Sequence, residues 1–274
     1  MSLRELVVAV LAGVVQGIVE WLPISSTGNV SLFLTVMGVS PEIAVQLALF
    51  LQVGTTLSAA VYYRETIREA VAAAPGWRPE GAFTGPNADT TFVVVACAMT
   101  GLIGIPLYVL FIDLASELTG GLFVAVIGVL LVLTGLLQRA TEAIGLGEKE
   151  HPNLLDAVLV GAIQGLSILP GVSRSGTTAS VLLFRGHAGP SAFRLSFLLS
   201  IPAGLGAGVL IVLDTGGVPT NTGAEAVLAL LTSAVVGYVV IDALMRIVHR
   251  VEFWVVCLGL GALCILGGGL TVVL

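Results

Sequence analysis

The sequence has very little charge. Only 10% of its 274 residues are Asp, Glu, Lys or Arg, whereas soluble globular proteins carry about 25%. Hydrophobic residues make up 57% of the chain, and the mean hydropathy is +1.06. Apolar segments of about 20 residues recur along the chain, and this length crosses a hydrocarbon core as a helix. These values exclude an ordinary soluble protein and predict an all-α integral membrane protein.

Lysine and cysteine are also scarce. One lysine and ten arginines stand against 17 acidic residues, which gives a net charge of -6. This is not the basic balance of a nucleic-acid-binding protein, so no nucleic-acid partner is expected. Cys97, Cys257 and Cys264 lie inside apolar segments and lack the spacing of a disulfide or metal motif. They are predicted to be packing residues.

Six segments are predicted to span the membrane. They cover roughly 43–63, 92–112, 121–139, 191–213, 225–247 and 252–273. Lys and Arg follow the first, third and fifth spans, whereas the loops 113–120 and 214–224 contain acidic residues and neither Lys nor Arg. The positive-inside rule therefore places the first set of loops in the cytoplasm and the second set outside. Residues 64–91 contain turn signals and are predicted to be a surface connector.

Two further apolar stretches, 3–38 and 155–187, are interrupted by polar motifs that contain Gly and Pro. Basic residues flank 155–187 on both sides, so this stretch is predicted to enter from the cytoplasm and return as a re-entrant hairpin. The stretch 3–38 is predicted to be its partner, which enters from outside; Arg4 is the one charge on the wrong side of this arrangement. Backbone of this kind is tolerated within a membrane only where protein or a wet cavity surrounds it. The two hairpin tips should therefore meet inside the bundle.

The two interrupted stretches resemble each other. GVVQGIVEWLPISSTGN (13–29) and GAIQGLSILPGVSRSGT (161–177) share a Gln-Gly step, a Leu-Pro step and a Ser-rich run that ends in Gly. A chance match of short Gly, Ser and Pro motifs is the alternative. The predicted fold is one membrane domain, 1–274, with an inverted-topology repeat, a design that places binding sites near the membrane midplane. Repeat 1 covers about 1–139, as hairpin 3–38 plus three spans, and repeat 2 covers about 155–274, as hairpin 155–187 plus three spans.

The interrupting motifs suit an anionic ligand. Each one opens a new helix, and a helix N-terminus carries free N–H groups and partial positive charge. Two such ends and Arg174, which can bind phosphate in a bidentate manner, predict a phosphate site. The predicted phosphate-binding side chains are Ser25, Thr27, Asn29, Ser173, Ser175, Thr177 and Thr178, together with Ser26. Any single Ser or Thr is equally well explained by local structure, and Glu20 and Arg174 also fit a purely structural ion pair.

The motifs QGIVEWLPISSTGN and LPGVSRSGTT resemble the two signatures of the undecaprenyl-diphosphate phosphatase family of the BacA/UppP type, and the resemblance covers essentially the whole chain. It implies hydrolysis of a long-chain polyprenyl diphosphate to the monophosphate and inorganic phosphate, which recycles the lipid carrier for cell-envelope glycan synthesis. It also implies bacitracin resistance, a divalent cation (Mg²⁺ or Ca²⁺), and a plasma-membrane location with the active site open to the extracytoplasmic side. The implied partners are the polyprenyl diphosphate and the bilayer, and a homodimer is left open.

The resemblance also assigns residue roles. It makes Glu20 a catalytic or metal-associated carboxylate, Ser26 a nucleophile or phosphate ligand, and Arg174 the phosphate clamp, with Gln16 and Gln164 in support. Many family members have Glu where this chain has Gln16, and the family usually has His where this chain has Asn29. Asparagine cannot take a proton, and the chain's histidines, His151, His187 and His249, all lie near predicted cytoplasmic ends.

Two mechanisms stay open at this point. Either Ser26 attacks the terminal phosphorus, or Glu20 and a metal activate water for direct attack. Two other functions also fit the sequence, namely a lipid-phosphate flippase or transporter and a non-catalytic relative that binds lipid phosphates.

Overall fold

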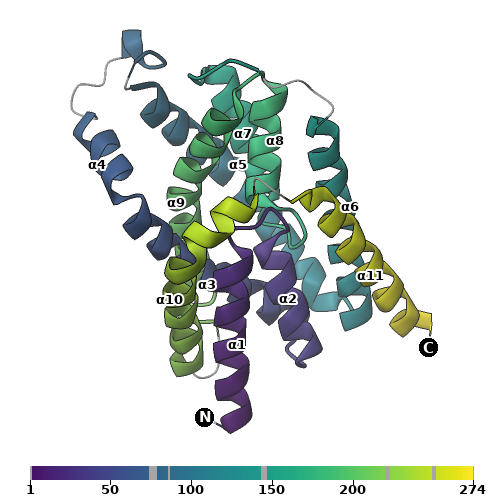
Figure 1. The fold of residues 1–274 in the computed structure, drawn as a ribbon. Coiled ribbons are helices and arrows are strands. Elements are labelled where there is room, and N and C mark those ends of the chain that lie inside the picture. The colour runs from purple at the N-terminus through teal and green to yellow at the C-terminus, as the bar shows by residue number, and fades with distance from the viewer. Residues whose placement is uncertain are drawn as a thin grey trace.

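The computed structural model describes residues 2–73, 79–85, 87–142, 147–219, 223–248 and 251–273. These residues form α-helices joined by short connections, and their only β-type pairing is an isolated bridge between Lys149 and His187. Figure 1 shows the arrangement of the helices. In chain order they are α1 (Leu3–Val19), α2 (Ser26–Val36), α3 (Pro41–Tyr62), α4 (Arg64–Ala73), α5 (Asn87–Glu117), α6 (Gly120–Glu142), α7 (Leu154–Leu166), α8 (Arg174–Phe184), α9 (Gly189–Asp214), α10 (Gly223–Val248) and α11 (Phe253–Val273).

Six of these helices are long and apolar enough to cross a membrane: α3, α5, α6, α9, α10 and α11. They coincide with the six predicted spans to within a few residues at each end. Large hydrophobic side chains lie exposed on their outer faces, including Leu102 on α5, Val209 on α9 and Leu266 on α11. Because a soluble protein rarely exposes so much contiguous apolar surface, this surface faces lipid, and the chain is a multi-pass membrane protein.

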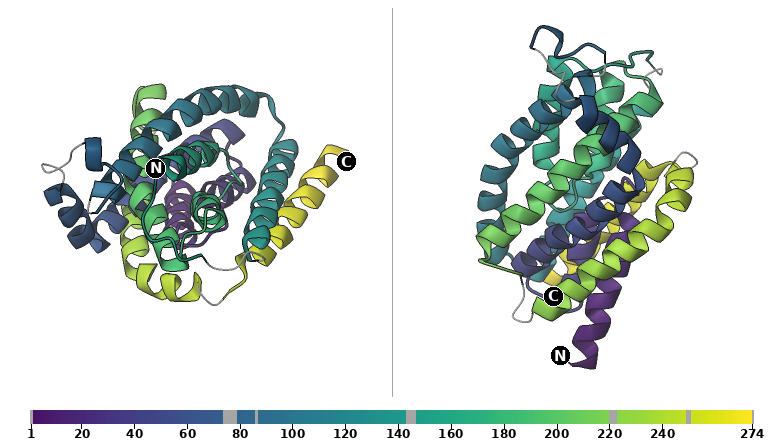
Figure 2. Two further views of the ribbon diagram at one scale, coloured as in Figure 1. Left: turned by 90° about the horizontal axis from the view of Figure 1, so that it is seen from above. Right: turned by 90° about the vertical axis from the view of Figure 1, so that its left-hand side faces the viewer.

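Four of the five shorter helices, α1, α2, α7 and α8, form two hairpins. The first hairpin is α1 and α2 with its tip at residues 20–25, and the second is α7 and α8 with its tip at residues 167–173. The hairpins run in from opposite ends of the bundle and turn back near its middle (Figure 1). Seen from above, the longer helices surround both of them (Figure 2). The polar interruptions predicted from the sequence are therefore the two hairpin tips.

The connector predicted over 64–91 differs from the prediction because it contains a helix. Helix α4 occupies Arg64–Ala73, a short 3-10 turn follows at Pro79–Gly81, and α5 already begins at Asn87. The sequence of α4, RETIREAVAA, consists mostly of Arg, Glu and Ala, which are strong helix formers. Its helix propensity outweighed the turn signals of the residues that follow.

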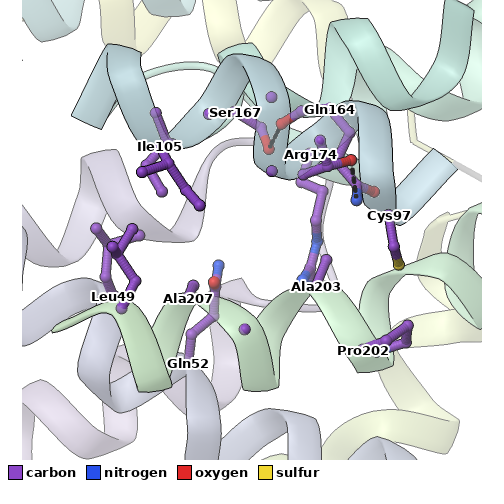
Figure 3. Close-up of a pocket in the computed structure, with 17 residues that line it drawn as sticks. Leu49, Gln52, Cys97, Ile105, Gln164, Ser167, Arg174, Pro202, Ala203 and Ala207 are labelled. Carbon is purple, nitrogen blue, oxygen red and sulfur yellow. Dashed lines mark hydrogen bonds between the residues drawn. The ribbon is translucent and has the colours of Figure 1, made fainter. Parts of the chain in front are cut away.

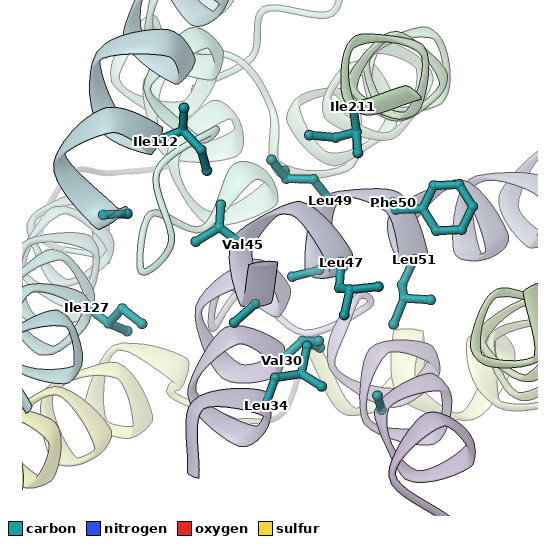
Figure 4. Packing of buried hydrophobic residues seen from close by; sticks show 14 of the residues in the cluster. Val30, Leu34, Val45, Leu47, Leu49, Phe50, Leu51, Ile112, Ile127 and Ile211 are labelled. Carbon is teal, nitrogen blue, oxygen red and sulfur yellow. The ribbon is translucent and has the colours of Figure 1, made fainter. Parts of the chain in front are cut away.

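Helix α3 runs through the centre of the molecule, and 78% of its most apolar 18-residue window is buried. Figure 4 shows Val45, Leu49 and Leu51 of α3 among side chains of four other helices. Those neighbours are Val30 and Leu34 of α2, Ile112 of α5, Ile127 of α6 and Ile211 of α9. This core holds the first hairpin and the surrounding spans in one body around the two tips.

Candidate active site

The two hairpin tips touch. The Ser25 hydroxyl oxygen accepts hydrogen bonds from the Gly28 N–H of its own hairpin at 3.2 Å and from the Gly171 N–H of the opposite tip at 3.0 Å. A Cβ atom added to Gly28 would lie 2.7 Å from the Gly171 nitrogen, so only glycine fits this contact. The predicted meeting of the tips is confirmed.

Ser25 has an unusual backbone conformation. Its φ of 62° makes it the one non-glycine residue with a positive φ in the described part of the chain. Such a conformation costs about 1–3 kcal/mol in a non-glycine residue and persists only where the surroundings enforce it. Here it turns the Ser25 side chain back so that it caps α2 and reaches the second tip.

Glu20, Ser26 and Arg174 form one connected cluster across the tips. The Ser26 hydroxyl donates to Glu20 Oε2 at 2.6 Å, and the Arg174 guanidinium donates to Glu20 Oε1. Only 5% of the Glu20 side chain and 16% of the Arg174 side chain are exposed. Arg174 also donates to the Ser200 carbonyl oxygen of α9 at 3.1 Å, which orients the guanidinium. The structure thus places a hydroxyl and a guanidinium on the two oxygens of one carboxylate.

Gln16 extends this cluster on the side of α1. Its amide nitrogen donates to Glu20 Oε2 at 2.8 Å and to Thr55 Oγ1 at 3.3 Å. Its amide oxygen is buried and has no hydrogen-bond partner. Buried polar atoms are nearly always paired, so a free oxygen next to a carboxylate can accept a ligand.

Both helices that leave the tips present free donors. The N–H groups of Ser26, Thr27, Arg174 and Ser175 lie in the first turns of α2 and α8 and make no hydrogen bond to any described residue. The next N–H of each helix is capped by a serine, Gly28 by Ser25 and Gly176 by Ser173. Uncapped first-turn N–H groups attract anions. Together with Arg174 they make this place suitable for a phosphate.

Asn29 has a structural contact. Its amide nitrogen donates to the carbonyl oxygens of Ile24 at 2.7 Å and of Ser25 at 2.9 Å. The asparagine therefore holds the backbone of the first tip against the start of α2. No described histidine lies where the family's histidine is expected, and His249 lies outside the described residues.

The other predicted phosphate-binding side chains are close by, but several have local partners. The Thr177 hydroxyl donates to the Ser173 carbonyl, and the Thr178 hydroxyl contacts the Arg174 carbonyl and Ser196 Oγ. Thr27 is buried and Ser175 is half-buried, and neither side chain has a hydrogen bond among the described residues. Their contact with phosphate stays a prediction.

Helix α6 supplies contacts that the sequence analysis did not single out. Gln138 Nε2 donates to the Pro23 carbonyl oxygen at 2.6 Å, and the Thr134 hydroxyl donates to the Gly171 carbonyl oxygen at 3.1 Å. One span thus holds both tips. A polar residue within the predicted span 121–139 was the available signal, because polar groups inside a membrane need partners.

A second polar cluster lies at the base of the second hairpin, where α7 begins and α8 ends. Asp156 is fully buried, accepts from Lys149, from Arg185 at 2.8 Å and from the Asn153 N–H at 2.9 Å, and lies 3.1 Å from His187 Nε2. Burial raises the pKa of this carboxyl, but these partners outweigh burial and hold its pKa well below the usual range. Lys149 precedes α7 and Arg185 follows α8 in the sequence. Because Asp156 binds both side chains, it joins the two ends of the hairpin at its base.

A cavity of about 280 Å³ adjoins the cluster at Arg174. Figure 3 shows Gln52 and Ala207 on one side of it and Gln164, Ser167 and Arg174 on the other. Gln164 donates to Thr100 Oγ1 at 3.1 Å. Gln52 also lines the cavity and was not among the predicted site residues.

Comparison with known proteins identifies the family of the chain. The model of the family described as bacitracin resistance protein BacA matches residues 9–263. The chain belongs to this family. It is similar to proteins named undecaprenyl-diphosphatase from three archaea. It is 51% identical to that of Haloarcula marismortui (97% of this chain, 98% of the relative), 40% to that of Methanopyrus kandleri (96% of each) and 37% to that of Methanococcoides burtonii (97% of this chain, 98% of the relative).

Proposed function

We propose that the protein is a membrane phosphatase that hydrolyses a long-chain polyprenyl diphosphate of the undecaprenyl type to the lipid monophosphate and inorganic phosphate. The observation that carries this proposal is the hydrogen bond from Ser26 to Glu20 beside Arg174, between two helix N-termini that meet across the tips. A nucleophile paired with a base next to a preorganised anion site is the arrangement that phosphoryl transfer needs. The names of the relatives support the same reaction and substrate.

In the first step, Ser26 Oγ attacks the terminal phosphorus and its proton passes to Glu20 Oε2, which lies 2.6 Å away. The bond from that phosphorus to the bridging oxygen breaks, and the lipid monophosphate leaves. Arg174 and the free N–H groups of the first turns stabilise the charge on the phosphoryl oxygens. Arg174 can do so only when its bond to Glu20 loosens, and this frees the carboxylate to act as the base.

In the second step, water attacks the phosphoserine, and the proton held by Glu20 returns to Ser26 Oγ as the bond between phosphorus and Ser26 Oγ breaks. Both protons of the water stay on the inorganic phosphate that is released. Direct attack by water would use the same carboxylate and the same anion site. The Ser26–Glu20 hydrogen bond favours the serine route. Asn29 takes no part in proton transfer in either route, because its amide nitrogen is bound to two backbone carbonyls.

A divalent cation, Mg²⁺ or Ca²⁺, is part of the proposal and would have to be held by few protein groups. No group of three or more His, Cys, Asp or Glu side chains that could hold a metal occurs among the described residues. Mg²⁺ often binds through one or two protein oxygens while substrate phosphates and water complete its shell. Glu20 and the unpartnered Gln16 Oε1 would supply the protein oxygens. The ion would neutralise phosphate charge.

The opposed hairpins support the proposed inverted repeat within one domain, 1–274. Helices α2 and α8 both contain 11 residues and follow serines whose side chains cap the third N–H of the helix, Ser25 and Ser173. The repeats would be 1–139 and 155–274, with re-entrant hairpins 3–38 and 155–187. Charge distribution supports a plasma-membrane orientation with the first hairpin entering from outside and the site open to the extracytoplasmic face. The absence of a nucleic-acid partner and the possible homodimer stay predictions.

The direct test is phosphate release from undecaprenyl diphosphate or farnesyl diphosphate by the purified protein in detergent. Ser26→Ala and Glu20→Gln should each lower kcat at least about a thousandfold, as removal of a nucleophile or its base does. Ser116→Ala, which changes an exposed serine at the end of α5, is the matched control and should leave kcat unchanged. Equal background release by wild type and both site variants would refute the phosphatase.

A flippase or transporter is the second candidate, because two opposed hairpins that meet at the centre suit alternating access. Reconstituted liposomes distinguish the two functions. Protein-dependent movement of a labelled lipid phosphate without phosphate release would indicate a flippase, and saturable binding without either would indicate a non-catalytic lipid-phosphate-binding protein.

A further inference from the structure

The cavity next to Arg174 is lined by two buried glutamines whose hydrogen bonds are incomplete among the described residues. Gln52 of α3 is 7% exposed, points into the cavity (Figure 3) and makes no side-chain hydrogen bond to any described residue. Gln164 of the second hairpin is 2% exposed, and its Oε1 atom is buried without a partner. Buried amides are costly unless they are paired. Gln164 Nε2 donates to Thr100 Oγ1, so only its acceptor oxygen is unused, whereas the Gln52 amide faces the cavity with its donor unpaired among the described residues. This indicates that a polar ligand completes the hydrogen bonds of Gln52.

Arg174 connects this cavity with the Ser26–Glu20 pair. Its guanidinium lines the cavity and also donates to Glu20 Oε1 and to the Ser200 carbonyl. The cavity therefore lies next to the place where the terminal phosphate would be attacked. The only charged side chain on the cavity wall is this cation, so the ligand group that fits beside it is an anion.

The cavity also reaches the outer surface of the bundle. Ile105 of α5 and Pro202 and Gly206 of α9 line it and are themselves exposed, on faces that carry the lipid-exposed residues Leu102 and Leu205. Most of its remaining wall is apolar or glycine. An opening of this kind admits a hydrocarbon chain.

The corresponding space between α3 and α10 is closed. Ser233 Oγ donates to the Leu51 carbonyl at 3.0 Å, and a Cβ on Gly54 would lie 2.4 Å from the Leu230 carbonyl oxygen. In the proposed repeat, α10 corresponds to α5 and α3 corresponds to α9. The cavity beside α5 and α9 therefore has no counterpart beside α10 and α3, and it exists in one half only. This asymmetry indicates that the cavity is a specific feature of the second half and not a by-product of the fold.

We propose that this cavity is the subsite for the phosphate that stays on the lipid and for the first isoprene units, and that the rest of the chain leaves between α5 and α9. The proposal rests on the phosphatase function above. Gln52 Nε2 and the Arg174 guanidinium bind the retained phosphate, while the terminal phosphate lies at Ser26. A volume of about 280 Å³ is at the lower end of small-molecule sites, about 300–1,000 Å³. It therefore holds the phosphate and a short part of the chain, and a long chain must extend through the opening.

Gln52 is tested by binding, which does not depend on hydrolysis. Affinity is measured on wild type and Gln52→Leu, for farnesyl monophosphate and for a farnesyl diphosphate analogue in which a methylene group replaces the oxygen between the two phosphorus atoms. Gln52→Leu should weaken binding about tenfold, the effect of losing one hydrogen bond to a charged group. Gln46→Leu is the matched control, since Gln46 is a buried glutamine of the same helix that bonds Asp214 away from this cavity.

A parallel titration with inorganic phosphate tests whether the cavity binds the phosphate group of a lipid or free phosphate. The proposal expects weak binding of inorganic phosphate and little effect of Gln52→Leu on it. Unchanged farnesyl monophosphate affinity in folded Gln52→Leu would overturn the proposal, and so would loss of inorganic phosphate binding alone. A different outcome is that the wild type binds farnesyl monophosphate, Gln52→Leu weakens this binding, and the wild type releases no phosphate. In that case the phosphatase proposal fails and the subsite stands.

The opening is tested with a bulky residue at Gly206. A Cβ there meets no atom within 4 Å, so Gly206→Phe should fold and obstruct the passage between α5 and α9. It should raise KM for farnesyl diphosphate at least about tenfold and change KM for dimethylallyl diphosphate, whose single isoprene unit fits inside, much less. Gly259→Phe, at an equally open position on the lipid-facing side of α11, should change neither. An equal effect of Gly206→Phe on both chain lengths would refute the passage.

Discussion

Arg174 and Glu20 are separated by 154 residues and form an ion pair that joins the two hairpin tips. Each residue belongs to a different hairpin, and neither tip has another side chain of opposite charge at this place among the described residues. The ion pair therefore forms only when the two hairpin tips are in contact. It also keeps the Glu20 carboxylate next to Ser26 before substrate binds.

Removal of one partner of this pair should destabilise the protein. Arg174→Leu leaves Glu20 buried and unpaired, and breaking a buried pair in this way costs about 3–5 kcal/mol. The double variant Glu20→Gln/Arg174→Leu should recover part of this loss, because no buried charge is left. Thermal unfolding of the detergent-solubilised protein measures both. A double variant no more stable than Arg174→Leu would contradict the assigned ion pair.

Two small substitutions at Ser25 separate the contribution of its side-chain hydrogen bonds from the cost of its strained backbone. Ser25→Ala keeps the strained positive φ and loses the bonds to the Gly28 and Gly171 N–H groups, so it should cost about 1–3 kcal/mol. Ser25→Gly loses the same bonds but relieves the strain, so it should be the more stable of the two. The difference in thermal midpoint between the variants tests the left-handed conformation, and a less stable Gly variant would contradict it.

Gly28→Ala should separate the tips. The added Cβ would approach the Gly171 nitrogen to 2.7 Å, and both groups are backbone atoms that cannot rotate away. We expect kcat for a prenyl diphosphate to fall by about a hundredfold, since small displacements of catalytic groups have effects of this size. Gly267→Ala, at an open position on α11, is the control and should behave as wild type.

Asn29→Asp should be more damaging than Asn29→Ala. The Asn29 amide nitrogen donates to two carbonyl oxygens, and a carboxylate in its place would face both of them with negative charge near an anionic substrate. Asn29→Ala should lower kcat/KM about tenfold through loss of the two bonds, and Asn29→Asp should lower it further. Steady-state phosphate release measures this order, and equal activity of Asn29→Asp and wild type would show that the amide donors have no such role.

The Asp156 cluster predicts a stability that depends on acid pH. Because the pKa of Asp156 is lower in the folded than in the unfolded protein, its contribution is complete above the unfolded value, about 4, and is lost as pH falls below it. Asp156→Asn should lower the free energy of unfolding by about 1–3 kcal/mol at pH 7. Thermal midpoints between pH 7 and pH 3 measure this, and the two proteins should converge toward the acid end. A gap that stays constant over this range would contradict the assignment.

Several features were readable from particular residues. The apolar segments predicted all six spans, and the placement of Gly, Pro and Ser in 13–29 and 161–177 predicted the two interruptions. Glu20 and Arg174 stood out because ionisable side chains are rare in such segments. Gln52 and Gln138 did not stand out, because a polar residue in a span has many possible neighbours and the sequence does not say which helix it faces. Asp156 was missed because its partners, Lys149 and Arg185, come from both sides of the hairpin.

The sequence by itself determined that the chain crosses a membrane through six helices, which two motifs interrupt the apolar pattern, and which residue types could bind phosphate. These properties follow from local composition, since transfer into lipid and helix capping act on residues near one another in the chain. Only the tertiary structure decided that Ser26 donates to Glu20, that Arg174 reaches Glu20 from the opposite tip, and that Gln52 and Gln164 face one cavity. Such contacts depend on how helices far apart in sequence pack together, and no short stretch of sequence contains that information.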